Sequence, residues 1–138
     1  MADEPDTQSK SNIEDSSQPN LWLDSDGIIH EHHSEEFVTK NLAMFAASER
    51  KRLAGIDKRP LLVTFDNLVG FSPDTRDMDL DFILANVKAL AYAADPNTAG
   101  GRQTIEVYNS FFSTTPWPLP VRIFTSRSEA LAWLKTFA

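Results

Sequence analysis

An uncharged run of branched and aromatic residues near the middle of the chain constrains its fold more than any other feature. Residues 59–66 (RPLLVTFD) begin with a basic residue and a proline and end with an acid. Such a run is typical of a strand that is buried on both faces at the centre of a sheet. Residues 67–71 then predict a turn, and Ser72, Pro73 and Asp74 predict the cap and first residues of a helix.

Length, charge and composition limit the classes of function. The 138 residues suffice for one domain with an adequate core. The net charge of −7 argues against nucleic-acid binding, which requires clustered Lys and Arg. The absence of cysteine excludes disulfides and thiolate metal sites. No apolar run approaches the roughly 20 residues that span a bilayer, and the polar start is unlike a signal peptide. We therefore expect a cytoplasmic protein without membrane insertion.

The first part of the chain predicts a tail, a hairpin and a long helix. Residues 1–20 carry five acids and one lysine, which predicts a disordered acidic tail before a domain at residues 21–138. Two short apolar runs flank a turn in which Gly27 can take a positive φ, as in a β-hairpin. Ser34 is the expected cap of a helix with Glu35 and Glu36 in its first turn. Residues 50–52 (RKR) lie in its last turns and Gly55 ends it.

The second half of the chain predicts alternating helices and strands, with one ambiguous stretch. Local propensity favours one long helix over residues 74–95, whereas the alternative breaks it near Asn86 and makes residues 88–94 a strand of small residues. Residues 101–112 predict a helix and 121–124 a strand. Ser126 and Glu129 form a capping box that opens the last helix. Together these elements predict an α/β domain in which helices pack on a single mixed, mostly parallel sheet begun by the hairpin.

This order of elements resembles the STAS/SpoIIAA-like superfamily, and within it the small bacterial domains of unassigned function. The residues that carry the resemblance are 59–63 (RPLLV), 109–112 (NSFF), 121–125 (VRIFT) and 129–134 (EALAWL). The resemblance covers nearly the whole chain after Asn20, and it implies the break near Asn86 and the strand at 88–94. These are core and cap residues, so they indicate a fold rather than an activity.

The resemblance also implies a candidate for regulation by phosphorylation. In the anti-sigma-factor antagonists of this superfamily, a strand that ends in Asp leads to an Asp-Ser-Ser-Gly turn, where a partner kinase phosphorylates the serine. Asp66 matches the acid at the strand end, but residues 71–75 (FSPDT) replace that turn and Pro73 follows the serine directly. Ser72 or Thr75 is the corresponding phosphate acceptor, and a plain helix cap is the alternative role of Ser72.

The sequence offers weak candidates for metal and anion binding. His30 and His32 would share one face of a strand, at a spacing that suits Zn²⁺ or Ni²⁺, with His33 beside them. Glu31 would point away and a third ligand is not evident, so we expect a solvated strand end, no metal and no cofactor. Residues 100–101 (GG) precede a helix but lack the spacing of a phosphate loop, so we expect a flexible loop.

Aromatic residues late in the chain are the candidates for a pocket or an interface. Tyr108, Phe111 and Phe112 have helical spacing, which fits core packing or pocket lining, and Trp117 lies between prolines. Trp117 could cap a pocket, lie on a dimer surface or pack over the sheet edge.

Two functional hypotheses follow, and neither involves an enzyme, because no nucleophile and acid/base constellation is present. The first is a non-enzymatic protein-interaction or regulatory domain that forms a homodimer and binds another regulatory protein. The alternative is a domain that binds a small apolar, lipid-like ligand, which a cavity of roughly 300 Å³ or more would favour.

Overall fold

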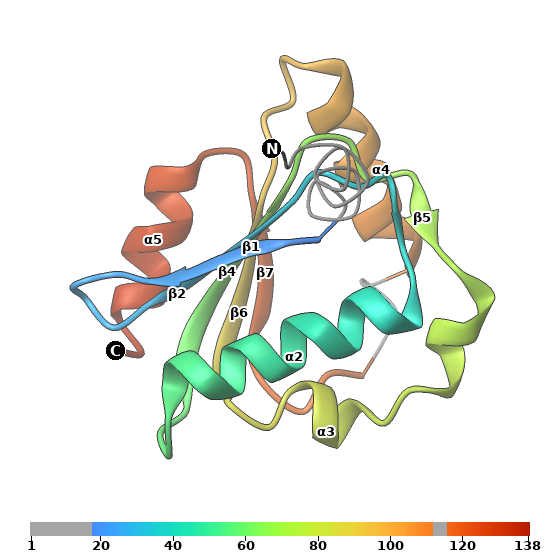
Figure 1. The fold of residues 1–138 in the computed structure, drawn as a ribbon. Helices are drawn as coiled ribbons and strands as arrows, with labels where there is room; N and C mark the ends of the chain where they lie inside the picture. Colours follow the sequence, from blue (N-terminus) through green and yellow to red (C-terminus); the bar gives the residue numbers. More distant parts are fainter. Residues whose placement is uncertain (1–17, 112–115) are drawn as a thin grey trace, which may run out of the picture.

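The computed structural model describes residues 18–111 and 116–138, and it is built on a five-stranded sheet (Figure 1). The strands, in spatial order, are β1 (Asn20–Leu23), β2 (Ile29–His33), β4 (Arg59–Phe65), β6 (Val87–Ala93) and β7 (Val121–Phe124). The β1–β2 pair is antiparallel and the other three pairs are parallel. The prediction of a mixed, mostly parallel sheet begun by a hairpin is confirmed.

Strand β4 lies in the middle of this sheet, bonded to β2 on one side and β6 on the other. Leu61, Leu62 and Val63 point to alternating faces and are only 2%, 0% and 4% exposed. Removing a side chain of this size from water stabilises the fold by about 1.5–3 kcal/mol. The uncharged run is therefore buried on both faces, as predicted.

The hairpin turn is held by a side chain and by one glycine. The Asp24 carboxylate accepts hydrogen bonds from the backbone N–H groups of Asp26 and Ile28, at 2.8 and 3.0 Å. Gly27 has φ +82°, a conformation that residues with a Cβ rarely adopt. These local features fix the register in which Trp22 lies opposite His30.

The two faces of the sheet are covered differently (Figure 1). Helix α5 (Arg127–Lys135) packs on one face, against the small side chains of Ala89, Ala91 and Ala93, so the helix approaches the strands closely. Helix α2 (Lys40–Ala54) lies over the other face, where Leu90 and Tyr92 are large. The described residues include no helix with the length and apolar character needed to cross a membrane.

The ambiguous stretch after β4 is broken, as the family resemblance implied. It contains a 3₁₀ helix, η1 (Pro73–Asp77), and a single-turn helix, α3 (Leu80–Ile83), before strand β6 begins at Val87. The Asn86 carbonyl accepts a hydrogen bond from the Arg59 N–H at 2.9 Å, which brings the start of β6 to the start of β4. Sheet pairing therefore outweighs the helical propensity of this stretch.

The predicted start of the long helix at Ser34 is wrong. The helix α2 begins after Thr39, whose hydroxyl accepts a hydrogen bond from a backbone N–H of the first turn. Residues 34–36 instead form an irregular segment with a bend, and β3 (Phe37–Val38) pairs in parallel with β5 (Gly70–Phe71) in a separate two-stranded sheet. Val38 is buried next to this pairing, in a small core cluster, and its burial outweighs the local helix signal of Ser34, Glu35 and Glu36.

The expectation of a flexible loop at residues 100–101 is also wrong. Both glycines lie in the first turn of α4 (Ala99–Phe111). A Cβ on Gly100 would lie 2.0 Å from the Asp66 carbonyl oxygen, and one on Gly101 would lie 1.8 Å from the Asp95 carbonyl oxygen. Close packing of the helix against two strand ends, rather than flexibility, requires glycine here.

Candidate functional site

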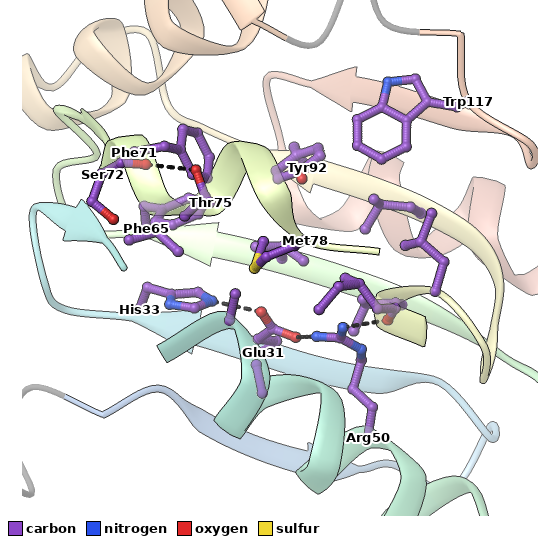
Figure 2. A pocket seen from close by; sticks show the side chains of 18 of the residues that line it. Glu31, His33, Arg50, Phe65, Phe71, Ser72, Thr75, Met78, Tyr92 and Trp117 are labelled. Atoms are coloured by element: carbon purple, nitrogen blue, oxygen red, sulfur yellow. Dashed lines mark hydrogen bonds and ion pairs between the residues drawn. The ribbon is translucent and has the colours of Figure 1, made fainter. Parts of the chain in front are cut away.

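A cavity of about 500 Å³ lies between the sheet and the elements on the α2 side (Figure 2). Strands β4 and β6 supply Leu61, Val63, Leu90 and Tyr92 to it, and Met78 and Trp117 also line it. Among the described elements that lie over this part of the sheet, η1 and α3 are short. They do not fill the space above the strands, in contrast to the close packing of α5 on the opposite face.

Glu31, His33 and Arg50 line one wall of the cavity, and together with Glu35, which contacts His33, they form a buried network of four charged side chains that we call the charged network. Arg50 Nη1 donates to Glu31 Oε1 at 2.6 Å, and Arg50 Nη2 donates to the Ile83 carbonyl oxygen at 2.7 Å. His33 Nε2 contacts Glu31 Oε2 at 2.6 Å, and His33 Nδ1 contacts Glu35 Oε2 at 2.5 Å. Figure 2 shows Glu31 between His33 and Arg50.

Strand geometry explains which residues join this network. Successive side chains of β2 alternate between faces, so Glu31 and His33 face the cavity together with Ile29. His30 and His32 face the other way. Arg50 reaches the network from the buried side of helix α2, where it is 4% exposed.

Glu31 and His33, which contact each other, are both charged at neutral pH. Burial alone would raise the pKa of Glu31, but the Arg50 guanidinium and the bond to His33 outweigh it and lower that pKa to about 2. Burial alone would lower the pKa of His33, but its bonds to Glu31 and Glu35 raise it to about 9. Because both ring nitrogens face carboxylate oxygens, both carry a proton, and the ring is an imidazolium.

The network is balanced in charge but not fully hydrogen-bonded. Two carboxylates, one imidazolium and one guanidinium sum to zero. Among the described residues, Arg50 Nε and Glu35 Oε1 are buried without a hydrogen-bond partner. Buried polar atoms of this kind are uncommon in folded proteins, and they are suited to bind a water molecule or a polar group of a ligand.

Three of the candidate residues from the sequence line the cavity, namely Ser72, Thr75 and Trp117. The Ser72 hydroxyl bonds to the Asp74 carboxylate, and the Thr75 hydroxyl donates to the Ser72 carbonyl oxygen at 2.7 Å. Ser72 caps η1 by position, but its side chain makes no capping bond to the helix backbone. A phosphate on Ser72 would lie beside the negative charge of Asp74.

The remaining aromatic candidates are Tyr108, Phe111 and Phe112, and Tyr108 is not among the described residues that line the cavity. Tyr108 is buried and meets Tyr92 edge-on, with ring centroids 5.3 Å apart, so it packs behind the cavity wall. Phe111 is the last residue of α4, and Phe112 lies outside the described residues. Their role as pocket or interface residues stays a prediction.

The two histidines on the other face of β2 each bond to a carboxylate. His30 contacts Asp24 at 2.8 Å and accepts a hydrogen bond from Arg127 at 2.7 Å. His32 contacts Asp66 at 3.0 Å. In residues 18–111 and 116–138, no three His, Asp or Glu side chains are grouped as ligands for a metal.

Sequence reasoning missed the charged network. It placed Arg50 among the basic residues that favour a helix C-terminus, and it noted only that Glu31 points away from His30 and His32. One signal was present: Arg50 lies four residues after Ala46 and four before Ala54, on the buried stripe of the helix.

Comparison with known proteins identifies the fold but no activity. Residues 21–138 match the model of a family described as "Domain of unknown function (DUF7793)". The structure is similar to the crystal structure of an uncharacterised protein from the DUF3478 family of Shewanella loihica PV-4, which has a SpoIIAA-like fold. The TM-score is 0.55 at 18% identity, over 84% of this chain and 91% of that chain. None of the curated proteins compared with the chain matched it. The SpoIIAA-like fold predicted from the sequence is confirmed.

Proposed function

The chain belongs to the family described as a domain of unknown function (DUF7793), and from this premise we propose that it is a non-enzymatic domain that binds a small, largely apolar molecule. The cavity carries this proposal. Its volume of about 500 Å³ falls within the roughly 300–1,000 Å³ of small-molecule sites. Apolar side chains from β4 and β6 form its floor, and a small number of polar groups lie at its walls, which is the usual composition of such sites.

The hydrogen bonding of the cavity supports a binding role over a catalytic one. A nucleophile requires a base within hydrogen-bond reach. The hydroxyl groups of Ser72 and Thr75 bond to Asp74 and to a backbone carbonyl, and His33 is held between two carboxylates. The described polar groups of the cavity therefore do not form an activated nucleophile.

Occlusion of the cavity tests this proposal. Ala46 lies on α2, lines the cavity and is 1% exposed, so Ala46→Leu places added carbon atoms in the space. Ser48, two residues further along the same helix, is exposed, so Ser48→Leu is the matched control. The probe is Prodan, an uncharged naphthalene dye whose emission changes in an apolar environment.

We expect Prodan to bind the wild type saturably with one site, and Ala46→Leu to weaken binding at least about tenfold, since filling the site removes the apolar contacts that a ligand would make. Ser48→Leu should bind like the wild type. A folded Ala46→Leu variant with unchanged affinity, or a wild type that does not bind the dye, contradicts the proposal.

A role in protein interaction is the second candidate. Phe37 is 53% exposed on β3, and Val69, next to β5, is 37% exposed, so apolar surface remains on the small sheet. Aromatic side chains such as Phe37 are enriched at protein interfaces. A homodimer that also binds a regulatory protein in the cytoplasm, with Ser72 or Thr75 as a phosphate acceptor, stays a prediction. Sedimentation equilibrium of the wild type and of Phe37→Asp tests the dimer, and a strict monomer would argue against it.

A further inference from the structure

The charged groups on the cavity wall are already neutralised by one another. Arg50 and Glu31 form a buried ion pair at 2.6 Å, and His33 lies between the carboxylates of Glu31 and Glu35. Among the described residues that line the cavity, Tyr92 is the other titratable side chain. Burial, followed by the charge of Glu31, raises its pKa, so it is uncharged at neutral pH. The described residues of this wall, together with Glu35, therefore present no net charge.

Among the described residues, a ligand with a full charge would find no free counter-ion inside this cavity. An anion that recruited Arg50 would have to displace Glu31, leaving that carboxylate buried beside a second negative charge. A cation that recruited Glu31 would compete with both Arg50 and His33. Burying an unpaired charge costs several kcal/mol, whereas an uncharged hydroxyl requires only one hydrogen bond.

Uncharged hydrogen-bonding groups, in contrast, are available at the walls. Ser72 and Thr75 line the cavity, and their hydroxyl oxygens, whose protons are donated to Asp74 and to the Ser72 carbonyl oxygen, keep lone pairs that can accept a hydrogen bond. Arg50 Nε is a buried donor without a partner among the described residues. On the basis of the proposed binding function, we infer that the cavity selects uncharged molecules with an apolar body and a hydroxyl-like end, and that it rejects carboxylates and amines of the same length.

Three eight-carbon probes with one chain and different ends test this selectivity. At pH 7, 1-octanol is neutral, octanoate is an anion and octylammonium is a cation. Each competes with bound Prodan on the wild-type protein, and the concentration that halves the Prodan signal is compared. We expect octanol to compete at least about tenfold more effectively than either ion, since a difference of 1.4 kcal/mol already gives a factor of ten.

The outcomes separate this inference from the function on which it rests. If Prodan binds and octanoate or octylammonium competes as well as octanol, the selectivity is overturned and the binding function stands. If neither Prodan nor octanol binds, the binding function falls and the selectivity with it.

A charge change in the network gives a second, directional test. Arg50→Gln leaves two carboxylates and one imidazolium, so the wall becomes negative. We expect octylammonium to gain at least about tenfold relative to octanol in this variant. Arg52→Gln removes the same charge two residues away on the exposed side of α2, where Arg52 pairs with Glu49, and it should leave the order of the probes unchanged.

If the three probes compete with Prodan on folded Arg50→Gln with the same relative effectiveness as on the wild type, the inference is overturned. If Arg50→Gln does not fold, the relative effectiveness of the three probes on the wild-type protein decides whether the inference stands.

Discussion

The raised pKa of His33 predicts that the domain loses stability as the pH rises above neutrality. Its pKa is about 9 in the folded protein, against the ordinary value of 6.5. A group whose pKa is raised by folding contributes stability that is fully present below the unfolded pKa and is lost as the pH rises through the folded pKa. The window of loss for His33 therefore runs from about pH 6.5 to about pH 9.

The size of the effect follows from the same two values. One pKa unit corresponds to 1.36 kcal/mol, so the difference for this buried side chain is on the order of 3 kcal/mol. A domain of this size has a total stability of roughly 5–15 kcal/mol, so the loss is large enough to measure. Glu31 has a lowered pKa, and it contributes stability above about pH 4.5 that is lost as the pH falls toward 2.

Urea denaturation followed by circular dichroism at pH 6, 7, 8 and 9 measures this dependence. We expect the free energy of unfolding of the wild type to fall by most of 3 kcal/mol over this range. His33→Gln should be less stable at pH 6 and nearly independent of pH. His32→Gln, its neighbour on the opposite face of β2, should keep the wild-type slope.

Two results would refute the reasoning about His33. One is a wild-type stability that stays constant within about 0.5 kcal/mol from pH 6 to 9, which is the usual size of a surface effect. The other is a folded His33→Gln variant with the wild-type pH dependence, since the slope would then belong to another group.

Two further predictions concern stability. Arg50→Gln leaves Glu31 with one fewer buried partner and should cost about 3–5 kcal/mol of unfolding free energy by urea denaturation. Arg52→Gln on the exposed side of α2 should leave the stability close to that of the wild type, and equal losses in the two variants would show that burial does not matter here. Gly100→Ala places a Cβ against the Asp66 carbonyl and should lower the free energy of unfolding by about 1–3 kcal/mol; an unchanged stability would show that α4 shifts freely.

Elements fixed by local rules were predictable from the sequence. The central strand follows from an uncharged run bounded by Pro60 and Asp66, and the hairpin follows from an acidic turn that ends in Gly27. The cap of the last helix is another case, since the Ser126 hydroxyl accepts a hydrogen bond from the Glu129 N–H at 3.0 Å. In each case the residues that determine the structure are neighbours in the sequence.

Elements fixed by distant partners were not predictable from the sequence. The β3–β5 sheet joins two segments of two residues each, which lie about thirty residues apart, and no pattern of that length signals pairing. The cavity depends on how η1 and α3 are held above the strands, and no periodicity encodes that distance. The charged network combines a strand residue, Glu31, with a helix residue, Arg50, whose position near the helix end already had a sufficient local explanation.

The charged network also explains how the cavity keeps its shape. A buried ion pair is often no more stable than apolar side chains of the same volume, so stability alone is a weak reason for it. Arg50, however, connects three elements around the cavity: it extends from α2, pairs with Glu31 on β2 and donates to the Ile83 carbonyl of α3. Hydrogen bonds have preferred directions, whereas apolar contacts do not. The bonds of Arg50 therefore fix the distance of α2 and α3 from the sheet. With flexible apolar side chains in its place, the two helices could move closer to the strands. Arg50 and Glu31, which neutralise each other's charge at the cavity wall, thus also hold α2 and α3 away from the sheet.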